Sequence, residues 1–464
     1  KELAEPRFKT PKDAKKIADT MVELYFQVKS RFGVDDHRHY LFTPRHLTAW
    51  VIGLGRYDLA SEDLLDVLSY EAQRLFRDRL VDEDSAGRFD GMLNSLIKSR
   101  WSKSPDIKNQ YFSCLMGASR VGGGGKVSEG KSGEGDDEGG SARAPDPMLL
   151  RVNNSDFEQI VKDGLELYER EERELNILLF AEVLDNIARV DRTLSKKSGS
   201  LLLVGRSGVG RRTATSLVAH MHGMQFHTLD ITNDFGKKGL HTQLKAVLQI
   251  AGVENEPCVF YVEDHHIANL SDVLETVNSL LSSGEVPGLY THEELEPLLS
   301  PLKELMLQDG NFRTAYDFFQ FRIQQNLHIV LGMDNVNPQF AVLCEANPAL
   351  FTRCEIIWMG EWTKGSMWEL PPLLLPTKFG EESELNGGKG DGGDLLRTCA
   401  NEIHKSTSDW KSTPYDFVVF LKTFEHLYGK KHDGLRTEIN HLKSGLSKLV
   451  EAAETVDKLS DEAR

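Results

Sequence analysis

Hydrophobic residues recur every three to four positions through the first part of the chain, a spacing that predicts amphipathic helices. The helical stretches are 13–32, 43–54 and 64–80. In none of them do apolar and polar residues alternate as they do in a half-buried strand. We therefore expect residues 1–118 to form an all-helical small subdomain.

Five short apolar runs in the middle of the chain predict strands instead. They occupy residues 200–204, 225–230, 258–262, 328–333 and 355–359. Helical patterns lie between them, at 213–222, 239–251, 272–282 and 316–325. Strands that alternate with helices predict a parallel sheet covered on both faces, so we expect residues 148–364 to form an α/β subdomain.

Two stretches lack the apolar side chains that a packed core needs. Residues 119–147 are mainly Gly, Ser, Asp and Glu, and we expect a flexible linker there. Residues 381–393 form a second low-complexity loop. This loop interrupts residues 365–436, whose helical patterns predict a second small helical subdomain.

The last segment, residues 437–464, has a different repeat. Its apolar residues are spaced alternately three and four apart, at Ile439, Leu442, Leu446, Leu449, Ala453 and Val456. This is heptad spacing, but the run is shorter than the three to four heptads that identify a coiled coil from sequence. The start of a coiled coil and an ordinary amphipathic end helix both remain open.

Composition and charge narrow the class of protein. The chain has 464 residues, of which 40% are hydrophobic and 27% charged, as in globular proteins. Its formal net charge of -16 argues against a nucleic acid or an anionic membrane as its main partner. The five cysteines lack metal-ligand spacing, and no apolar run is long enough for a transmembrane segment. The chain opens with Lys1 rather than Met, so we expect it to be part of a longer protein.

The candidate chemistry begins at a Gly-rich loop, residues 205–213. It follows the first strand run and precedes a helix, which is the setting of phosphate-binding loops. Arg211 stands where lysine is usual, and Arg212 delays the hydroxyl to Thr213. The candidate nucleotide contacts are Gly205, Gly208, Val209, Gly210, Arg211, Arg212 and Thr213. The alternative is an ordinary Gly-rich turn.

Two acids follow the strand run 258–262. In nucleotide hydrolases of this class the first acid helps to hold Mg²⁺ and the second polarises the attacking water. Here Glu263 comes first, so Glu263 and the Thr213 hydroxyl are the candidate metal ligands. Asp264 is the candidate catalytic base, one methylene shorter than the usual Glu. The alternative is a strand that ends in two solvated acids.

Three more polar residues are candidates for contacts with a nucleotide because they lie next to a predicted strand or at the start of a predicted helix. Asp334 follows the run 328–333, where a polar side chain normally orients the water or the γ-phosphate, but a loop-capping role is equally open. Arg353 precedes the run 355–359 and suits donation in trans to a neighbour's γ-phosphate. Arg45, one residue into its helix, is placed to reach a phosphate on an adjoining module.

Several of these motifs resemble dynein heavy chains. The loop, the acid-ending strand, the strand 326–330 and Arg353, in this order, are similar to an AAA+ module. The more specific resemblances are 42–50 and 70–80 to a dynein lid, 280–290 to the dynein module insert, and 441–449 to the first turns of the dynein stalk. This order resembles the end of the third module, the whole fourth and the stalk base. Residues 205–213 and 347–350 look most like the cytoplasmic dyneins of intraflagellar transport.

The resemblance implies a role for each candidate residue. The Gly-rich loop would bind the fourth module's ATP or ADP, with Mg²⁺ near Glu263. The altered loop, the inverted acids and Asp334 are expected to weaken hydrolysis there. Arg353 would be an arginine finger for the third module's nucleotide, which Arg45 would contact from that module's lid. The implied fold is an AAA+ P-loop module with helical lid subdomains and the start of an antiparallel coiled-coil stalk.

The resemblance also implies an activity and partners. The whole protein would be an ATPase, a minus-end-directed microtubule motor for retrograde intraflagellar transport in the cytoplasm and the cilium. Its partners would be the other AAA+ modules of the ring, the microtubule through the distal stalk, intermediate and light chains, transport cargo and a second heavy chain. The alternatives are a nucleotide-free structural module and a ring-shaped AAA+ remodelling ATPase. The heptad run argues against the second, because such proteins lack a stalk.

Overall fold

The computed structural model divides into two compact units, Lys1–Glu361 and Trp362–Arg464. The residues that it describes are 11–102, 105, 110–115, 146–175, 177–231, 236–269, 272–360, 367–368, 370–371, 374–375, 392–406 and 413–463. Most of the expected linker 119–147 and of the expected loop 381–393 lies outside the described residues.

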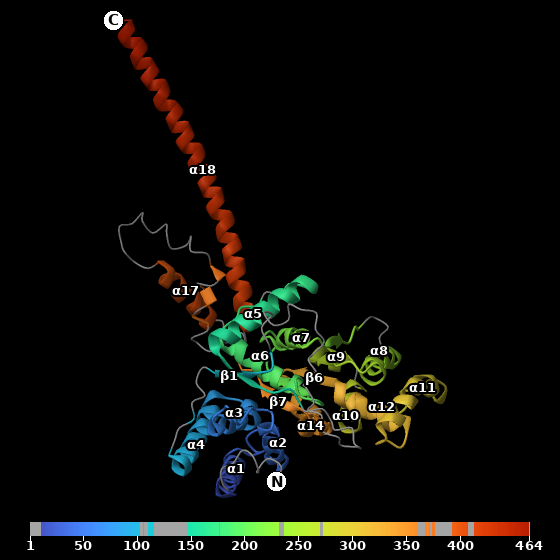
Figure 1. Cartoon of the computed structure of the whole chain (residues 1–464). Helices are drawn as coiled ribbons and strands as arrows, with labels where there is room; N and C mark the ends of the chain where they lie inside the picture. The colour runs from blue at the N-terminus through green and yellow to red at the C-terminus, as the bar shows by residue number, and fades with distance from the viewer. Residues whose placement is uncertain are drawn as a thin grey trace. The chain divides into compact units, whose positions relative to one another are not determined.

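The first unit opens with helices packed around aromatic side chains (Figure 1, blue). These helices are α1 (Pro11–Arg31), α2 (Arg45–Leu54), α3 (Leu64–Phe76), the 3₁₀ turn η1 (Arg77–Arg79) and α4 (Glu83–Trp101). Trp50, Phe76 and Phe89 are fully buried in one cluster. α3 begins after Asp63, whose carboxylate accepts the Leu65 N–H at 2.9 Å and caps the helix.

The prediction of an all-helical first subdomain is wrong, because this region contains a strand. β1 (Gln110–Ser113) pairs antiparallel with β2 (Leu150–Asn153). Phe112 of β1 is buried against the rings of Tyr57 and Tyr70, with ring centroids 5.1 and 4.9 Å apart. Each strand has four residues, too few for a readable alternation, and its partner lies about forty positions away.

A parallel five-stranded sheet forms the centre of the unit, in the order β4-β5-β6-β3-β7. The strands are β3 (Leu201–Val204), β4 (Gln225–Thr228), β5 (Cys258–Glu263), β6 (Leu327–Met333) and β7 (Glu355–Trp358). All four neighbouring pairs are parallel. The structure thus confirms the α/β fold class, and each of the five predicted runs contains a strand.

Helices cover both faces of this sheet (Figure 1). On one face lie α5 (Asn154–Glu171), α6 (Ala181–Leu194) and α7 (Arg211–Met221); on the other lie α8 (Lys237–Gln249), a π-helical turn (Ile250–Glu254), α9 (Asp264–Asn269), α10 (Asp272–Ser283), α12 (Ala315–Asn326), α13 (Phe340–Ala346) and α14 (Ala349–Arg353). Leu201 and Leu203 join the first cluster, whereas Leu202 and Val204 join the second. The inner strands β3, β5 and β6 read as almost continuous apolar runs because both faces are buried, whereas the edge strand β4 is mixed in sequence and only partly buried.

The sequence did not predict α11 (His292–Asp309), nor α4, α9, α13 and α14. α11 contains Pro297 and Pro301, which normally break a helical pattern. A capping box starts the helix, in which the Thr291 N–H donates to Glu294 Oε2 at 2.9 Å. Leu302 is fully buried and fixes the helix on the α/β core.

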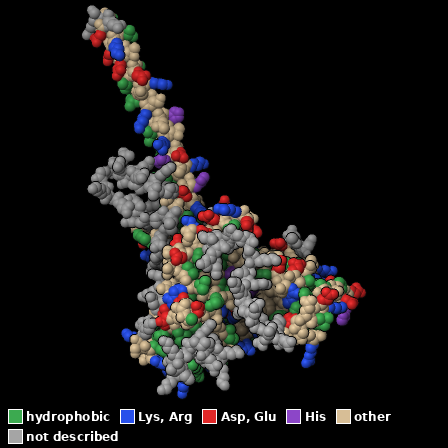
Figure 2. Space-filling view, in the orientation of Figure 1, with side chains coloured by type: hydrophobic (Ala, Val, Ile, Leu, Met, Phe, Trp, Pro, Cys, Tyr) green, Lys and Arg blue, Asp and Glu red, His purple; other side chains and the backbone are tan. Residues whose placement is uncertain are grey.

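The second unit contains α17 (Gly392–Ser406) and α18 (Pro414–Glu462). α18 is one helix of 49 residues that starts at a capping box between Thr413 and Asp416. It runs through positions 436 and 437 without a break, so no change of structure marks the expected subdomain boundary. Hydrophobic side chains remain exposed along it (Figure 2), with Leu442, Leu446 and Leu449 exposed by 73%, 63% and 69%. Among the described helices, none is long and apolar enough to cross a membrane.

We predict that Gly53→Ala destabilises the chain by about 1–3 kcal/mol, because the added methyl group overpacks a buried contact. A Cβ at Gly53 would lie 3.0 Å from Cδ of Glu71 and closer still to its Oε2. The Glu71 carboxylate cannot move aside without losing its bonds to Arg192 and Tyr57. Urea unfolding measures the change in unfolding free energy.

Gly91→Ala is the matched control, since Gly91 also lies inside a helix but a Cβ there would meet nothing within 4 Å. This change should stabilise the chain by about 0.5–1 kcal/mol through helix propensity. Equal effects of the two substitutions would contradict the proposed contact at Gly53.

Candidate functional site

The Gly-rich loop joins β3 to α7 at the carboxyl edge of the sheet. Gly208 and Gly210 both have φ of +91°, a conformation that favours glycine. A Cβ at Gly205 would overlap the carbonyl oxygen of Met359, so this glycine permits close packing beside the strand end. The Gly205 N–H donates to the Met333 carbonyl at 3.0 Å, which fixes the base of the loop.

Arg211 is the first residue of α7 and is only 7% exposed. Its Nη1 lies 3.5 Å from Oδ2 of Asp264, directly after β5. Burial raises the pKa of Asp264, although Arg211 and a hydrogen bond from the Asp334 backbone act to lower it. The fold thus brings Arg211, Asp264 and Asp334, which are far apart in the sequence, to one edge of the sheet.

Asp334 uses its side chain to cap its own loop. Its Oδ1 accepts the Val336 N–H at 2.9 Å. This is the loop-capping arrangement that the sequence left open beside a phosphate-sensing role. The Asp334 backbone N–H bonds to Asp264 and lowers its pKa, whereas the charge of the Asp334 carboxylate acts to raise it.

Glu263 is held by two histidines that the sequence suggested were ordinary loop residues. Its Oε2 lies 3.3 Å from Nδ1 of His265, and its backbone N–H donates to Nδ1 of His266 at 2.9 Å. Burial lowers the pKa of His266 to about 4, so this ring is neutral near pH 7. No spacing signal distinguishes His266, because its contact is to a neighbouring backbone group.

Gly332 of β6 is a second site residue that the sequence did not identify. A Cβ there would lie 2.8 Å from the Tyr261 hydroxyl and 3.7 Å from Nε of Arg211. Gly332 therefore leaves room for both side chains behind the loop. A glycine inside a strand is the available sequence signal for such a close approach.

The residues fit a nucleotide with its metal better than a metal alone. Thr213 lies in the first turn of α7, and Glu263 ends β5. In the part of the chain that the structure describes, no three His, Cys, Asp or Glu side chains form a metal site. Mg²⁺ commonly takes one or two protein ligands and completes its shell with phosphates and water. Glu263 and Thr213 suit that arrangement, in which the metal neutralises phosphate charge.

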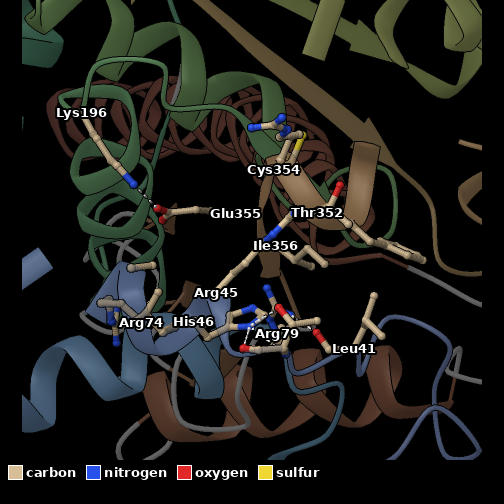
Figure 3. A pocket seen from close by; sticks show the side chains of 15 residues that line it. Leu41, Arg45, His46, Arg74, Arg79, Lys196, Thr352, Cys354, Glu355 and Ile356 are labelled. Atoms are coloured by element: carbon tan, nitrogen blue, oxygen red, sulfur yellow. Dashed lines mark hydrogen bonds and ion pairs between the residues drawn. The ribbon is translucent and has the colours of Figure 1, made fainter. Parts of the chain in front are cut away.

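A second candidate site is a pocket of about 450 Å³ in the first unit, between the N-terminal helices and the α/β part. Five cationic side chains line it: Arg45, Arg74, Arg79, Lys196 and Arg353. Glu355 is the one carboxylate among the lining residues. Figure 3 shows Arg45 and Arg79 on one side and Lys196 beside Glu355 on another. The excess of positively charged side chains in the pocket suits an anionic ligand.

The cations of this pocket differ in how far they are already paired. Arg74 lies 3.3 Å from carboxylate oxygens of both Asp78 and Asp185. Lys196 Nζ lies 3.6 Å from Oε1 of Glu355. Among the described residues, neither Arg45 nor Arg353 has an ion-pair partner. The structure thus brings these two predicted arginines to one cavity with their charges uncompensated.

A buried ion triad lies behind this pocket. Arg192 of α6 binds Glu71 of α3, with Nη2–Oε2 2.6 Å and Nε–Oε1 3.0 Å. Its Nη1 also lies 2.7 Å from Oε2 of Glu355, the first residue of β7. The Tyr57 hydroxyl donates to Glu71 Oε1 at 2.5 Å. No local sequence pattern predicts the triad, because its three members are over 100 positions apart.

We predict that Glu355 contributes a pH-dependent part of the unfolding free energy. Burial alone would raise the pKa of Glu355, but Arg192 and Lys196 lower it to about 2, from an ordinary value of 4.5. Its stabilisation is therefore present above about pH 4.5 and lost as the pH falls toward 2. The loss should be roughly 3 kcal/mol.

Urea unfolding of the wild type and of Glu355→Gln across this range measures that contribution. The difference in unfolding free energy between the two proteins should shrink as the pH falls, because only the wild type loses an ionised Glu355. A difference that stays constant with pH would contradict the prediction.

Two stretches of the chain match models of known protein families. Residues 175–427 match a family model described as the P-loop containing dynein motor region D4. Residues 3–86 match a second, described as the dynein heavy chain ATPase lid domain. The first of these covers more than half of the chain.

Individual relatives agree with the family models. Cytoplasmic dynein 2 heavy chain 1 of Tripneustes gratilla is 43% identical over 99% of this chain. The proteins of the same name from Homo sapiens and Chlamydomonas reinhardtii are 41% and 38% identical over 96% of it. The chain spans only 11%, 10% and 10% of the lengths of these three relatives. The chain therefore belongs to the dynein heavy-chain family, and its α/β unit is the P-loop motor region of that family.

Proposed function

We propose that this chain is a segment of an ATP-driven, minus-end-directed microtubule motor for retrograde intraflagellar transport in the cytoplasm and cilium. Its similarity to cytoplasmic dynein 2 heavy chains along almost its whole length supports this proposal. The segment would contribute two half-sites and a stalk base to the motor ring. The pocket that Arg45 and Arg353 share is the observation that carries this assignment.

Each region takes one role in the proposed ring. Residues 1–118 act as the lid of the third AAA+ module, and residues 119–147 connect it to the fourth. Residues 148–364 and 365–436 act as the large and small subdomains of the fourth module. Residues 437–464 begin the stalk. The exposed apolar positions of α18 support this last role, because an antiparallel partner helix would cover them.

The pocket receives the third module's nucleotide. Arg45 contacts its phosphates from the lid, and Arg353 reaches the γ-phosphate in trans as an arginine finger. Both arginines keep their full charge for the ligand, since no carboxylate among the described residues pairs with either. Charge-assisted bonds to phosphate are about twice as strong as neutral ones, so the two should supply much of the binding energy.

The Gly-rich loop binds the fourth module's nucleotide, ATP or ADP with Mg²⁺, and turns it over slowly. Gly205, Gly208 and Gly210 keep the backbone free for phosphate. The catalytic groups are weaker, because Asp264 is paired with Arg211 and Asp334 caps its own loop. Slow hydrolysis suits a regulatory module, while the ring's other modules supply the main ATPase activity.

The proposed partners follow from this role. They are the other AAA+ modules of the ring, the microtubule through the distal stalk, intermediate and light chains, transport cargo and a second heavy chain. The alternatives are a nucleotide-free structural module and a ring-shaped remodelling ATPase. The positive pocket favours a nucleotide-binding role over the first, and the length of α18 favours a stalk over the second.

We predict that Arg353→Ala and Arg45→Ala each weaken nucleotide binding in this pocket about tenfold, the usual effect of losing one charge-assisted bond. The measurement is photolabelling of the full-length heavy chain with an azido-ATP analogue. Mass spectrometry of the peptide that contains residues 41–49, which line the pocket, gives the half-saturating concentration at this site alone.

Arg38→Ala is the control for charge. Arg38 is 63% exposed, pairs with Glu345 at 3.2 Å and does not line the pocket. Its removal should leave the half-saturating concentration unchanged. If neither Arg353→Ala nor Arg45→Ala weakens labelling of the peptide, the pocket does not hold a nucleotide in the proposed way.

We also predict that the purified heavy chain carries nucleotide at the Gly-rich loop and that Gly208→Val displaces it. Gly208 has φ of +91°, which a β-branched side chain adopts only with strain. Photolabelling with the azido-ATP analogue, read on the peptide that contains residues 205–213, measures how much nucleotide the Gly-rich loop binds. An unlabelled wild-type peptide would favour the nucleotide-free structural alternative.

A further inference from the structure

The two unpaired pocket arginines come from different parts of the fold. Arg45 begins α2, whereas Arg353 ends the five-residue helix α14. Their separation in the sequence is large, and no hydrogen bond or ion pair joins them. Something else in the fold must therefore fix their relative position across the cavity.

The triad of Glu71, Arg192 and Glu355 connects the elements that carry them. Glu355 stands two positions after Arg353, at the start of β7. Arg192 ties this position to Glu71, which is 0% exposed. The Glu71 carboxylate in turn packs against Gly53 of α2, the helix that begins at Arg45. A series of contacts through Arg192 and Glu71 thus links β7, directly after Arg353, to α2, the helix that begins at Arg45.

The guanidinium of Arg192 suits this bridging position. Its planar fork donates twice to Glu71 and once to Glu355, and a lysine ammonium could not match that geometry. Arg56 adds a further restraint, because its Nη1 donates to the Arg192 carbonyl at 2.6 Å. Side chain and backbone of Arg192 are both held by the N-terminal helical region.

We infer that Arg192 is a positioning residue for the pocket, which sets Arg353 against Arg45 by binding Glu355 and Glu71 at once. This inference rests on the proposed nucleotide-binding role of the pocket and names a residue that acts on that site without touching the ligand. Breaking the triad releases β7 from α3 and lets the arginines separate. Phosphate binding then weakens although both arginines remain present.

The test must separate positioning from folding. Arg192→Met alone would leave the buried Glu71 carboxylate without an ion-pair partner and can unfold the chain. The informative variant is the triple change Glu71→Gln, Arg192→Met and Glu355→Gln, which leaves no unpaired charge in the triad. Arg192→Lys is a second variant, which keeps the charge but loses the fork. The thermal midpoint of each full-length variant checks that it is folded.

The control is Arg151→Met. Arg151 of β2 also bridges two carboxylates of the N-terminal region, Glu62 at 2.5 Å and Asp66 at 3.0 Å. It does not line the pocket. A general loosening between the two parts would affect both bridges alike, whereas positioning of the pocket arginines depends on Arg192 alone.

The readout is photolabelling of the peptide with residues 41–49 by the azido-ATP analogue, in the full-length heavy chain. We expect the triple variant and Arg192→Lys to raise the half-saturating concentration about three- to tenfold, and Arg151→Met to change it less than twofold. In a background of Arg45→Ala with Arg353→Ala, the triple change should add less than a further twofold, because the groups that it positions are gone.

The experiment distinguishes failure of the proposed nucleotide site from failure of the positioning role of Arg192. If Arg45→Ala and Arg353→Ala leave labelling unchanged, the proposed nucleotide site is wrong. If they weaken labelling but the triple change has no effect, or has the same effect with and without the two arginines, Arg192 does not position them. Loss through folding alone would add fully to the loss from the arginines.

Discussion

The buried bond between Arg192 and two glutamates is the constraint on which the first unit depends. Removing three charged groups from water costs several kcal/mol for each ion, and that cost is offset only when every group finds a partner. Here Glu71 is satisfied by Arg192 and by the Tyr57 hydroxyl. The helical region and the α/β part must therefore meet in one register, because any other would leave these charges unpaired.

That register decides where the functional groups lie. With α3 held against α6 and β7, the start of α2 and the end of α14 border the same cavity. The remaining ion pairs of the interface follow the same pattern, with Arg189 bound to both Asp78 and Asp185. Arg45 and Arg353 are exposed at this cavity, and among the described residues neither has an ion-pair partner. Their positive charge suits an anionic ligand.

The Gly-rich loop depends on a different constraint, the parallel sheet. Because β3, β5 and β6 run in one direction, their carboxyl ends meet at one edge. Arg211, Asp264 and Asp334 are brought together there. At this edge the backbone of the loop and the charged side chains beside it differ in one respect. The glycines retain their unusual φ angles, whereas the charged groups bind one another.

Local patterns along the chain predict much of the fold. Apolar runs identified β3, β5 and β6 because strands that are buried on both faces consist mostly of apolar residues. The Gly-rich loop, Asp264 and Arg353 could be proposed from the sequence because each lies next to the end or start of a predicted strand. The sequence did not predict β1, β2 or α11. β1 and β2 are too short to show a local pattern, and α11 contains two prolines, which normally indicate the end of a helix.

Contacts between residues far apart in the sequence could be seen only in the folded chain. In the folded chain Glu71 and Glu355 bind the same guanidinium, that of Arg192. Gly332 leaves room for Tyr261 and Arg211. Arg45 and Arg353 line the same pocket. None of these contacts joins residues close in the chain. Which charged or packed side chains meet depends on the fold of the whole chain. A local sequence pattern therefore cannot predict these contacts.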